Sequence, residues 1–175
     1  MNYTKEDLEF LKEHGFRENY PYGMLYDLDV TVKGDHADNR AGVYYIRNES
    51  GAMWVYYSSF LEMMIEYMSY ADMPHDEFEA MKAELLEDIQ IWIGKLNKVA
   101  GTSFKATYID IPMRFFMKAN IQEVDFQALC KKIRKFVVLM DRSLNEIFEK
   151  ICETSNWDVK FGDACIGDIT DIDDD

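Results

Sequence analysis

The stretch VYYIRNESGAMWVYY, residues 43–57, holds two runs of β-branched and aromatic residues on either side of a short polar segment. Residues 43–46 and 53–57 have the composition of strands, and residues 48–51 (NESG) have that of a tight turn. Two strands joined by so short a turn pair antiparallel. This stretch therefore predicts a β-hairpin, with an antiparallel sheet at the centre of the fold.

Further strands are predicted on both sides of this hairpin. Residues 25–32 alternate apolar and polar side chains from Leu28 onward, so the first three strands are expected to form a meander. Residues 104–121 also favour β structure, but Pro112 cannot donate to a central ladder and must interrupt the run or lie on an edge. We therefore expect one or two later strands.

Long helices are predicted around the sheet. In residues 124–153 apolar side chains recur at steps of three and four, which indicates a helix of about 45 Å with a wide buried face. Such a helix exceeds the span of the domain, so a dimer interface could cover its projecting end. Residues 5–14, the region from residue 60, and residues 74–99 also have helical patterns. The predicted fold class is α+β, an antiparallel sheet packed by long helices, the longest at the C-terminal end.

The length of 175 residues suits a single domain, which we place at residues 1–160, followed by an acidic, flexible tail at residues 161–175. The first ten residues are charged and lack the apolar core of a signal peptide. No apolar run approaches the ~20 residues of a membrane span. The three cysteines have no disulfide or metal-ligand spacing. We therefore expect a cytoplasmic protein without a membrane partner.

The net charge of −14 comes from two segments. Residues 60–93 hold nine acidic residues and one basic residue, Lys82, and residues 162–175 hold six aspartates and no basic residue. Residues 131–135 (KKIRK) form a basic counterpart. We expect this cluster to pair with the acidic helix within the fold or with a second copy of the chain. The overall negative charge argues against direct binding of nucleic acid.

The sequence contains no motif of an enzyme or a metal site. GxSxG, HExxH and the glycine-rich phosphate loops are missing, and the three histidines lie far apart. We therefore predict no catalytic residue, no cofactor and no metal. A metal-dependent enzyme is kept as an alternative, using the carboxylates of Asp27, Asp29 and Asp110. Asp27 and Asp29 share one face of the predicted strand.

The acidic face of the helix at residues 74–99 is the main candidate binding surface. Its carboxylates recur at offsets that keep them on one face or beside it. Aromatic residues crowd the hairpin, and because the faces of a strand alternate, they cannot all point into one core. Exposed tyrosine and tryptophan are enriched at binding hot spots. The predicted partner-binding residues are Asp76, Glu77, Glu84, Glu87, Asp88, Tyr45, Trp54 and Tyr56.

These features favour a non-enzymatic protein that binds a basic surface of a partner protein. Regularly placed negative charge can mimic a nucleic-acid backbone and speeds encounter with a basic groove. We therefore expect a stoichiometric inhibitor or neutraliser of a nucleic-acid-binding protein, as in phage anti-defence or immunity proteins. An ordinary solvated helix face is the alternative interpretation of the same charges.

The predicted order of elements, α-βββ-α-β(β)-α, also resembles the general layout of type III secretion chaperones. The resemblance is one of element order, together with a low isoelectric point and a long final helix. It implies a dimeric adaptor as a second alternative.

Overall fold

The computed structural model describes residues 3–21, 23–33, 38–46, 52–57, 74–108, 113–121, 123–154 and 160–164. Along the chain these residues form α1 (Lys5–Glu13), β1 (Arg17–Asn19), β2 (Gly23–Lys33), β3 (Asp38–Ile46), β4 (Ala52–Tyr57), α3 (His75–Ala100), β5 (Lys105–Tyr108), β6 (Met113–Lys118), α4 (Phe126–Thr154) and the 3-10 helix η1 (Phe161–Asp163). The α+β fold class predicted from the sequence is confirmed. The helix expected from residue 60 lies outside the described residues.

The strands form one antiparallel sheet of six, in the order β1-β2-β3-β4-β6-β5. The predicted meander is its centre, β2 to β4. The two later strands are also present, and β6 pairs with β4, so both join the meander in a single sheet. Two details differ from the prediction: β1 is a short strand that the sequence analysis does not predict, and β3 begins at Asp38, five residues before the strand predicted at residues 43–46.

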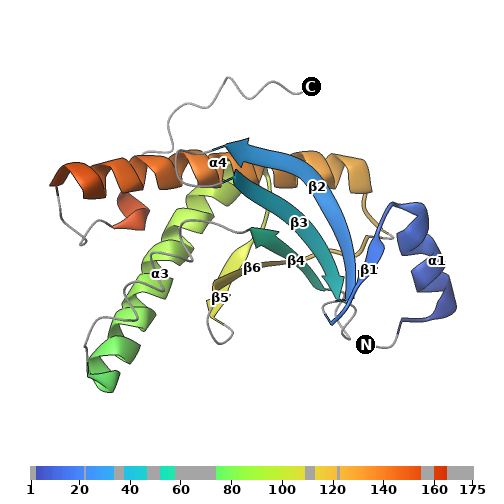
Figure 1. Cartoon of the computed structure of the whole chain (residues 1–175), viewed down its shortest axis with the longest axis horizontal. Coiled ribbons are helices and arrows are strands. Elements are labelled where there is room, and N and C mark those ends of the chain that lie inside the picture. Colours follow the sequence, from blue (N-terminus) through green and yellow to red (C-terminus); the bar gives the residue numbers. More distant parts are fainter. Residues whose placement is uncertain are drawn as a thin grey trace.

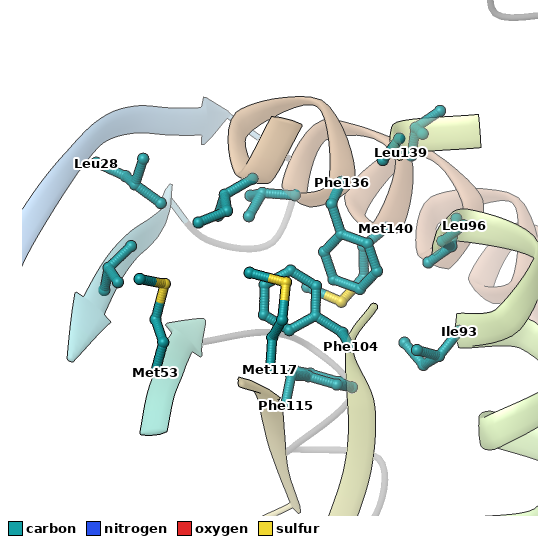
Figure 2. Packing of buried hydrophobic residues seen from close by; sticks show 14 of the residues in the cluster. Leu28, Met53, Ile93, Leu96, Phe104, Phe115, Met117, Phe136, Leu139 and Met140 are labelled. Atoms are coloured by element: carbon teal, nitrogen blue, oxygen red, sulfur yellow. The ribbon is translucent and has the colours of Figure 1, made fainter. Parts of the chain in front are cut away.

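The core lies between the sheet and α4, which crosses one face of the sheet (Figure 1). Figure 2 shows Leu28, Met53 and Met117 from three strands gathered with Phe136 and Met140 from α4. All five side chains are buried. Burying a side chain of this size stabilises a fold by roughly 1.5–3 kcal/mol, so this layer is the main source of stability.

The turn between α3 and β5 is held by one side chain, Asn97. Its amide nitrogen donates to the carbonyl oxygen of Phe104 at 2.7 Å, and its amide oxygen accepts from the Phe104 N–H at 2.9 Å. Gly101 ends α3 in the left-handed region, with φ at 71°. About two turns earlier on α3, Gln90 accepts the N–H of Ala106 on the edge strand β5 at 2.9 Å. Helix α3 therefore covers part of the sheet edge and satisfies its backbone.

The two terminal helices begin as their sequences indicate. Thr4 caps α1 and forms a capping box with Asp7. Asp125 precedes α4 and accepts N–H groups of Gln127 and Ala128 at 3.1 Å each. None of the described helices has the length and apolar composition needed to cross a membrane.

Candidate functional site

Helix α3 is divided along its length. Its C-terminal half is anchored by buried side chains that contact α4, β5 and η1, namely Ile89, Trp92, Ile93, Leu96 and Ala100. Within this half, the indole N–H of Trp92 donates to Ser143 Oγ of α4 at 2.8 Å. No described residue in the N-terminal half is fully buried. Figure 1 shows this half extending away from α4, so it forms a projecting surface.

Four predicted site residues lie on the outward face of this projecting half. Asp76, Glu77, Glu84 and Glu87 are all exposed. Glu87 precedes the buried Ile89 by two positions, and side chains two apart point to nearly opposite sides of a helix. The four carboxylates span about 16 Å along the axis. No basic side chain of the described residues forms an ion pair with any of them.

Their neighbour Glu79 is already partnered. Its carboxylate lies 2.8 Å from Lys82 Nζ, and this hydrogen bond, aided by the lysine charge, lowers the Glu79 pKa below its ordinary value. Lys82 is the single basic residue of the acidic segment. Its charge is therefore directed to the flank of α3 rather than to the outward face. We call Asp76, Glu77, Glu84 and Glu87 the acidic face of α3.

Asp88, which was predicted to bind a partner, instead makes contacts within the molecule. Its carboxylate accepts the N–H of Phe161 at 2.5 Å and the N–H of Gly162 at 2.9 Å. It therefore caps η1, with one hydrogen bond to each carboxylate oxygen. Local spacing does not reveal this contact, because it joins positions more than seventy residues apart. Binding of a partner by Asp88 stays a prediction.

The segment that Asp88 holds, residues 160–164, is here called the C-terminal clasp. Phe161 is buried against Trp92, with ring centroids 5.6 Å apart, and Lys95 Nζ donates to the carbonyl oxygen of Gly162. A side chain at Gly162 would meet the Asp88 carboxylate at 2.8 Å. These contacts hold residues 161–164 against α3, and residues 165–175 lie outside the described residues. The expected domain boundary stays a prediction.

The predicted aromatic residues lie on other elements than α3, Tyr45 on β3 and Trp54 and Tyr56 on β4. Tyr45 lies on β3 and is half-buried against the core, and its carbonyl oxygen accepts the Tyr3 hydroxyl. Burial, with a smaller effect of Tyr3, raises the pKa of the Tyr45 phenol above its ordinary value. The backbone register places Trp54 opposite Tyr44, and Tyr56 opposite Gly42, on β4. The side chains of Trp54 and Tyr56 lie outside the described residues. Strand β3 is three strands from β5, or about 14 Å from the edge that α3 covers.

An apolar residue that the sequence analysis missed does continue the acidic face. Ile91 is 54% exposed and follows Glu84 and Glu87 at seven and four positions. Residues at these offsets share one face of a helix. The sequence does indicate this exposure, because Ile91 lies off the helix face that carries the buried apolar residues of α3. The surface therefore combines carboxylates with one exposed aliphatic side chain.

The basic cluster does not neutralise α3 in the described part of the chain. Lys131 and Lys132 on α4 are exposed, Arg134 and Lys135 are half-buried, and none of the four forms an ion pair there. The expectation that this cluster pairs with the acidic helix inside the fold is therefore wrong for the described residues. Pairing with a second copy stays a prediction.

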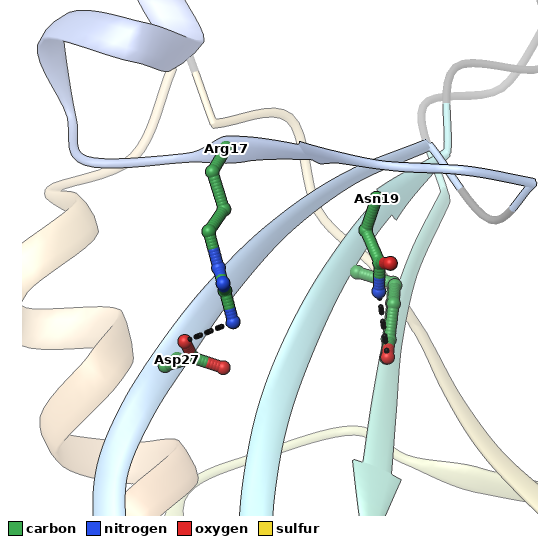
Figure 3. A network of polar contacts seen from close by, with 4 residues as sticks. Arg17, Asn19 and Asp27 are labelled. Carbon is green, nitrogen blue, oxygen red and sulfur yellow. Dashed lines mark hydrogen bonds and ion pairs between the residues drawn. The ribbon is translucent and has the colours of Figure 1, made fainter.

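The carboxylates of the enzymatic alternative are placed only in part. Asp27 and Asp29 are exposed on either side of the buried Leu28, on the strand face predicted for them. Figure 3 shows Arg17 from β1 reaching Asp27, with Nη2 to Oδ2 at 2.7 Å. Asp110 lies outside the described residues. The described residues contain no group of three His, Cys, Asp or Glu side chains arranged to hold a metal ion.

Cys130 is the cysteine whose side chain the structure describes, and it is fully buried on α4. Burial raises the pKa of its thiol to about 11, against a smaller opposing effect of Arg134. At neutral pH the thiol is therefore protonated and a poor nucleophile.

Comparisons of the chain with protein-family models, with curated proteins and with solved structures find no match.

Proposed function

We propose that this protein binds a partner protein through the acidic face of α3, and that the partner presents a basic surface of the kind that binds nucleic acid. The observation that supports this proposal is the unpaired state of Asp76, Glu77, Glu84 and Glu87, which the described basic residues leave un-neutralised. Like charges this close on one helix disfavour it slightly. A cationic partner removes that repulsion, so the charge favours association.

Binding would proceed in two steps. Concentrated charge first steers the basic partner to the projecting half of α3, which speeds the encounter at low ionic strength. Contact then buries the exposed Ile91 beside Glu84 and Glu87. Because α3 is anchored through its C-terminal half, the acidic face is presented on a fixed helix, which reduces the entropy lost on binding. Such a protein acts by occupying its partner's groove, without chemistry of its own.

The test is affinity capture from the native host with three forms of the full chain. The first is the wild type. The second reverses the acidic face (Asp76→Lys, Glu77→Lys, Glu84→Lys and Glu87→Lys). The third reverses four acids that are equally exposed elsewhere (Glu13→Lys, Glu123→Lys, Glu149→Lys and Glu153→Lys). The last two carry the same net charge, so any difference between them depends on position.

A protein captured by the wild type and by the third form, but not by the second, supports the proposal once it is purified and shown to bind directly. Its affinity should fall steeply as salt increases. If that protein binds nucleic acid, adding this chain should displace the nucleic acid. Equal capture by all three forms, or an affinity indifferent to salt, would show that the acidic face is an ordinary solvated surface.

A further inference from the structure

The outward face of α4 carries a second charged surface that the proposed function does not use. Lys131, Arg134, Lys135, Val138 and Arg142 recur at offsets of three, four, seven and eleven from the first residue, which places them on one continuous stripe. Lys131 and Arg142 are exposed, and the other three are half-buried. We call these five residues the basic stripe of α4. It is about 16 Å long and has an aliphatic side chain near its centre.

The stripe lacks anionic partners among the described residues. The four cations form no ion pair there, although they lie within three turns of one helix. Cations at i and i+4, such as Lys131 and Lys135, repel each other and destabilise a helix slightly. An anionic segment lying along the stripe would remove that repulsion. A good complement would also offer an apolar side chain to Val138.

Residues 165–175 have the matching composition. Their sequence, CIGDITDIDDD, repeats the pattern Ile-x-Asp three times, beginning at Ile166, Ile169 and Ile172. The last repeat ends in a run of three aspartates. Alternation of this kind combines a polyanion with evenly spaced apolar side chains. No basic residue interrupts it.

The C-terminal clasp fixes the start of this segment against α3, which packs on the buried face of α4. Phe161 packs on Trp92, and the indole of Trp92 donates to Ser143, the neighbour of Arg142 in α4. Eleven further residues span up to about 36 Å when extended, more than twice the length of the stripe. The clasp therefore starts the segment within reach and makes the encounter intramolecular, which raises its effective concentration.

We propose that residues 165–175 dock along the basic stripe of α4 in the same molecule. The aspartates pair with Lys131, Arg134, Lys135 and Arg142, and an isoleucine covers Val138. The contact would occupy the one strongly basic helix surface of the described residues and leave the acidic face of α3 exposed. The inference does not depend on the proposed function, since it concerns a different surface.

Amide NMR of the full chain tests this docking. The variant replaces the five tail aspartates by asparagine (Asp168→Asn, Asp171→Asn, Asp173→Asn, Asp174→Asn and Asp175→Asn), and a matched control neutralises five acids elsewhere (Glu6→Gln, Glu9→Gln, Glu13→Gln, Glu18→Gln and Glu123→Gln). We expect the tail variant to shift the amide signals of residues 131–142, and the control to leave them in place. High salt should shift the wild-type signals to the same positions, and dilution should have no effect.

Carbodiimide cross-linking of the wild-type chain provides a second measurement that needs no substitution. Links between tail aspartates and Lys131 or Lys135 in the monomeric fraction, lost at high salt, are expected. The proposal is overturned if amides 131–142 ignore the tail variant. It is also overturned if the links appear only in a dimeric fraction, because the occupant of the stripe would then be a second copy.

Discussion

Replacing Asp88 by alanine is expected to open the C-terminal clasp. The carboxylate accepts two backbone N–H groups, from Phe161 at 2.5 Å and from Gly162 at 2.9 Å. A hydrogen bond to a charged group is worth about 1.5–3 kcal/mol, and each buried N–H left unpaired costs about 1–3 kcal/mol. In the closed clasp, burial of the Phe161 side chain contributes ~1.5–3 kcal/mol. In the variant, the two unpaired N–H groups would cost a comparable or larger amount, so the clasp is expected to open.

The loss of stability cannot exceed what the closed clasp contributes to the free energy of unfolding. Once the clasp opens, water satisfies the freed N–H groups and their penalty disappears. We therefore expect the free energy of unfolding to fall by about 2–3 kcal/mol. In a chain of this size such a loss lowers the melting temperature by roughly 4–12 °C. The remainder of the fold should stay intact, since the sheet and α4 form the core independently of Asp88.

The assay is urea unfolding followed by circular dichroism, together with hydrogen exchange of the Phe161 and Gly162 amides. Glu87→Ala is the matched control: it removes the same charge one position away from an exposed side chain without a hydrogen bond in the described residues. The control should stay within ~0.5 kcal/mol of the wild type. The reasoning fails if Asp88→Ala unfolds at the same urea concentration as the control and both amides keep their protection.

Four further outcomes follow from polar groups that are buried or half-buried. Trp92→Phe removes the N–H that donates to Ser143 and leaves unfilled volume, so the free energy of unfolding should fall by about 2 kcal/mol in chemical denaturation; an unchanged value would contradict this account of the α3–α4 contact. Asn97→Ala leaves the N–H and the carbonyl of Phe104 without their partner. The free energy of unfolding should fall by roughly 1–3 kcal/mol, and hydrogen exchange of the Phe104 amide should become faster. Lys98→Ala, which changes an exposed neighbour, is the control. Cys130, whose thiol pKa is raised to about 11, should resist alkylation in the native protein at neutral pH and react in urea, as followed by peptide mass mapping. Because an unfolded thiol ionises near pH 8.5 and the folded one only near 11, this residue's contribution to stability is full below about pH 8.5 and declines as pH rises toward 11.

The candidate site was predicted only in part. The exposure of Asp76, Glu77, Glu84 and Glu87 agrees with the helical spacing, because the side of a helix that carries carboxylates follows from the position of its apolar stripe. The fate of Asp88 does not follow from spacing. The helical pattern predicts the same exposure for Asp88 as for Glu84. The two residues differ because η1 packs beside Asp88 in the folded molecule.

The same division holds for the fold. Patterns among residues close in sequence predicted α3, α4 and the strands of the meander, because helical and strand periods repeat within a few residues. The pairing of β4 with β6, the short strand β1 and the contact of the clasp with α3 join segments far apart in the chain. Such contacts depend on which surfaces remain uncovered once the core has packed. For that reason the helices and strands could be predicted from the sequence. The hydrogen-bond partners of Asp88 and the lack of ion pairs along the basic stripe among the described residues are known only from the tertiary structure.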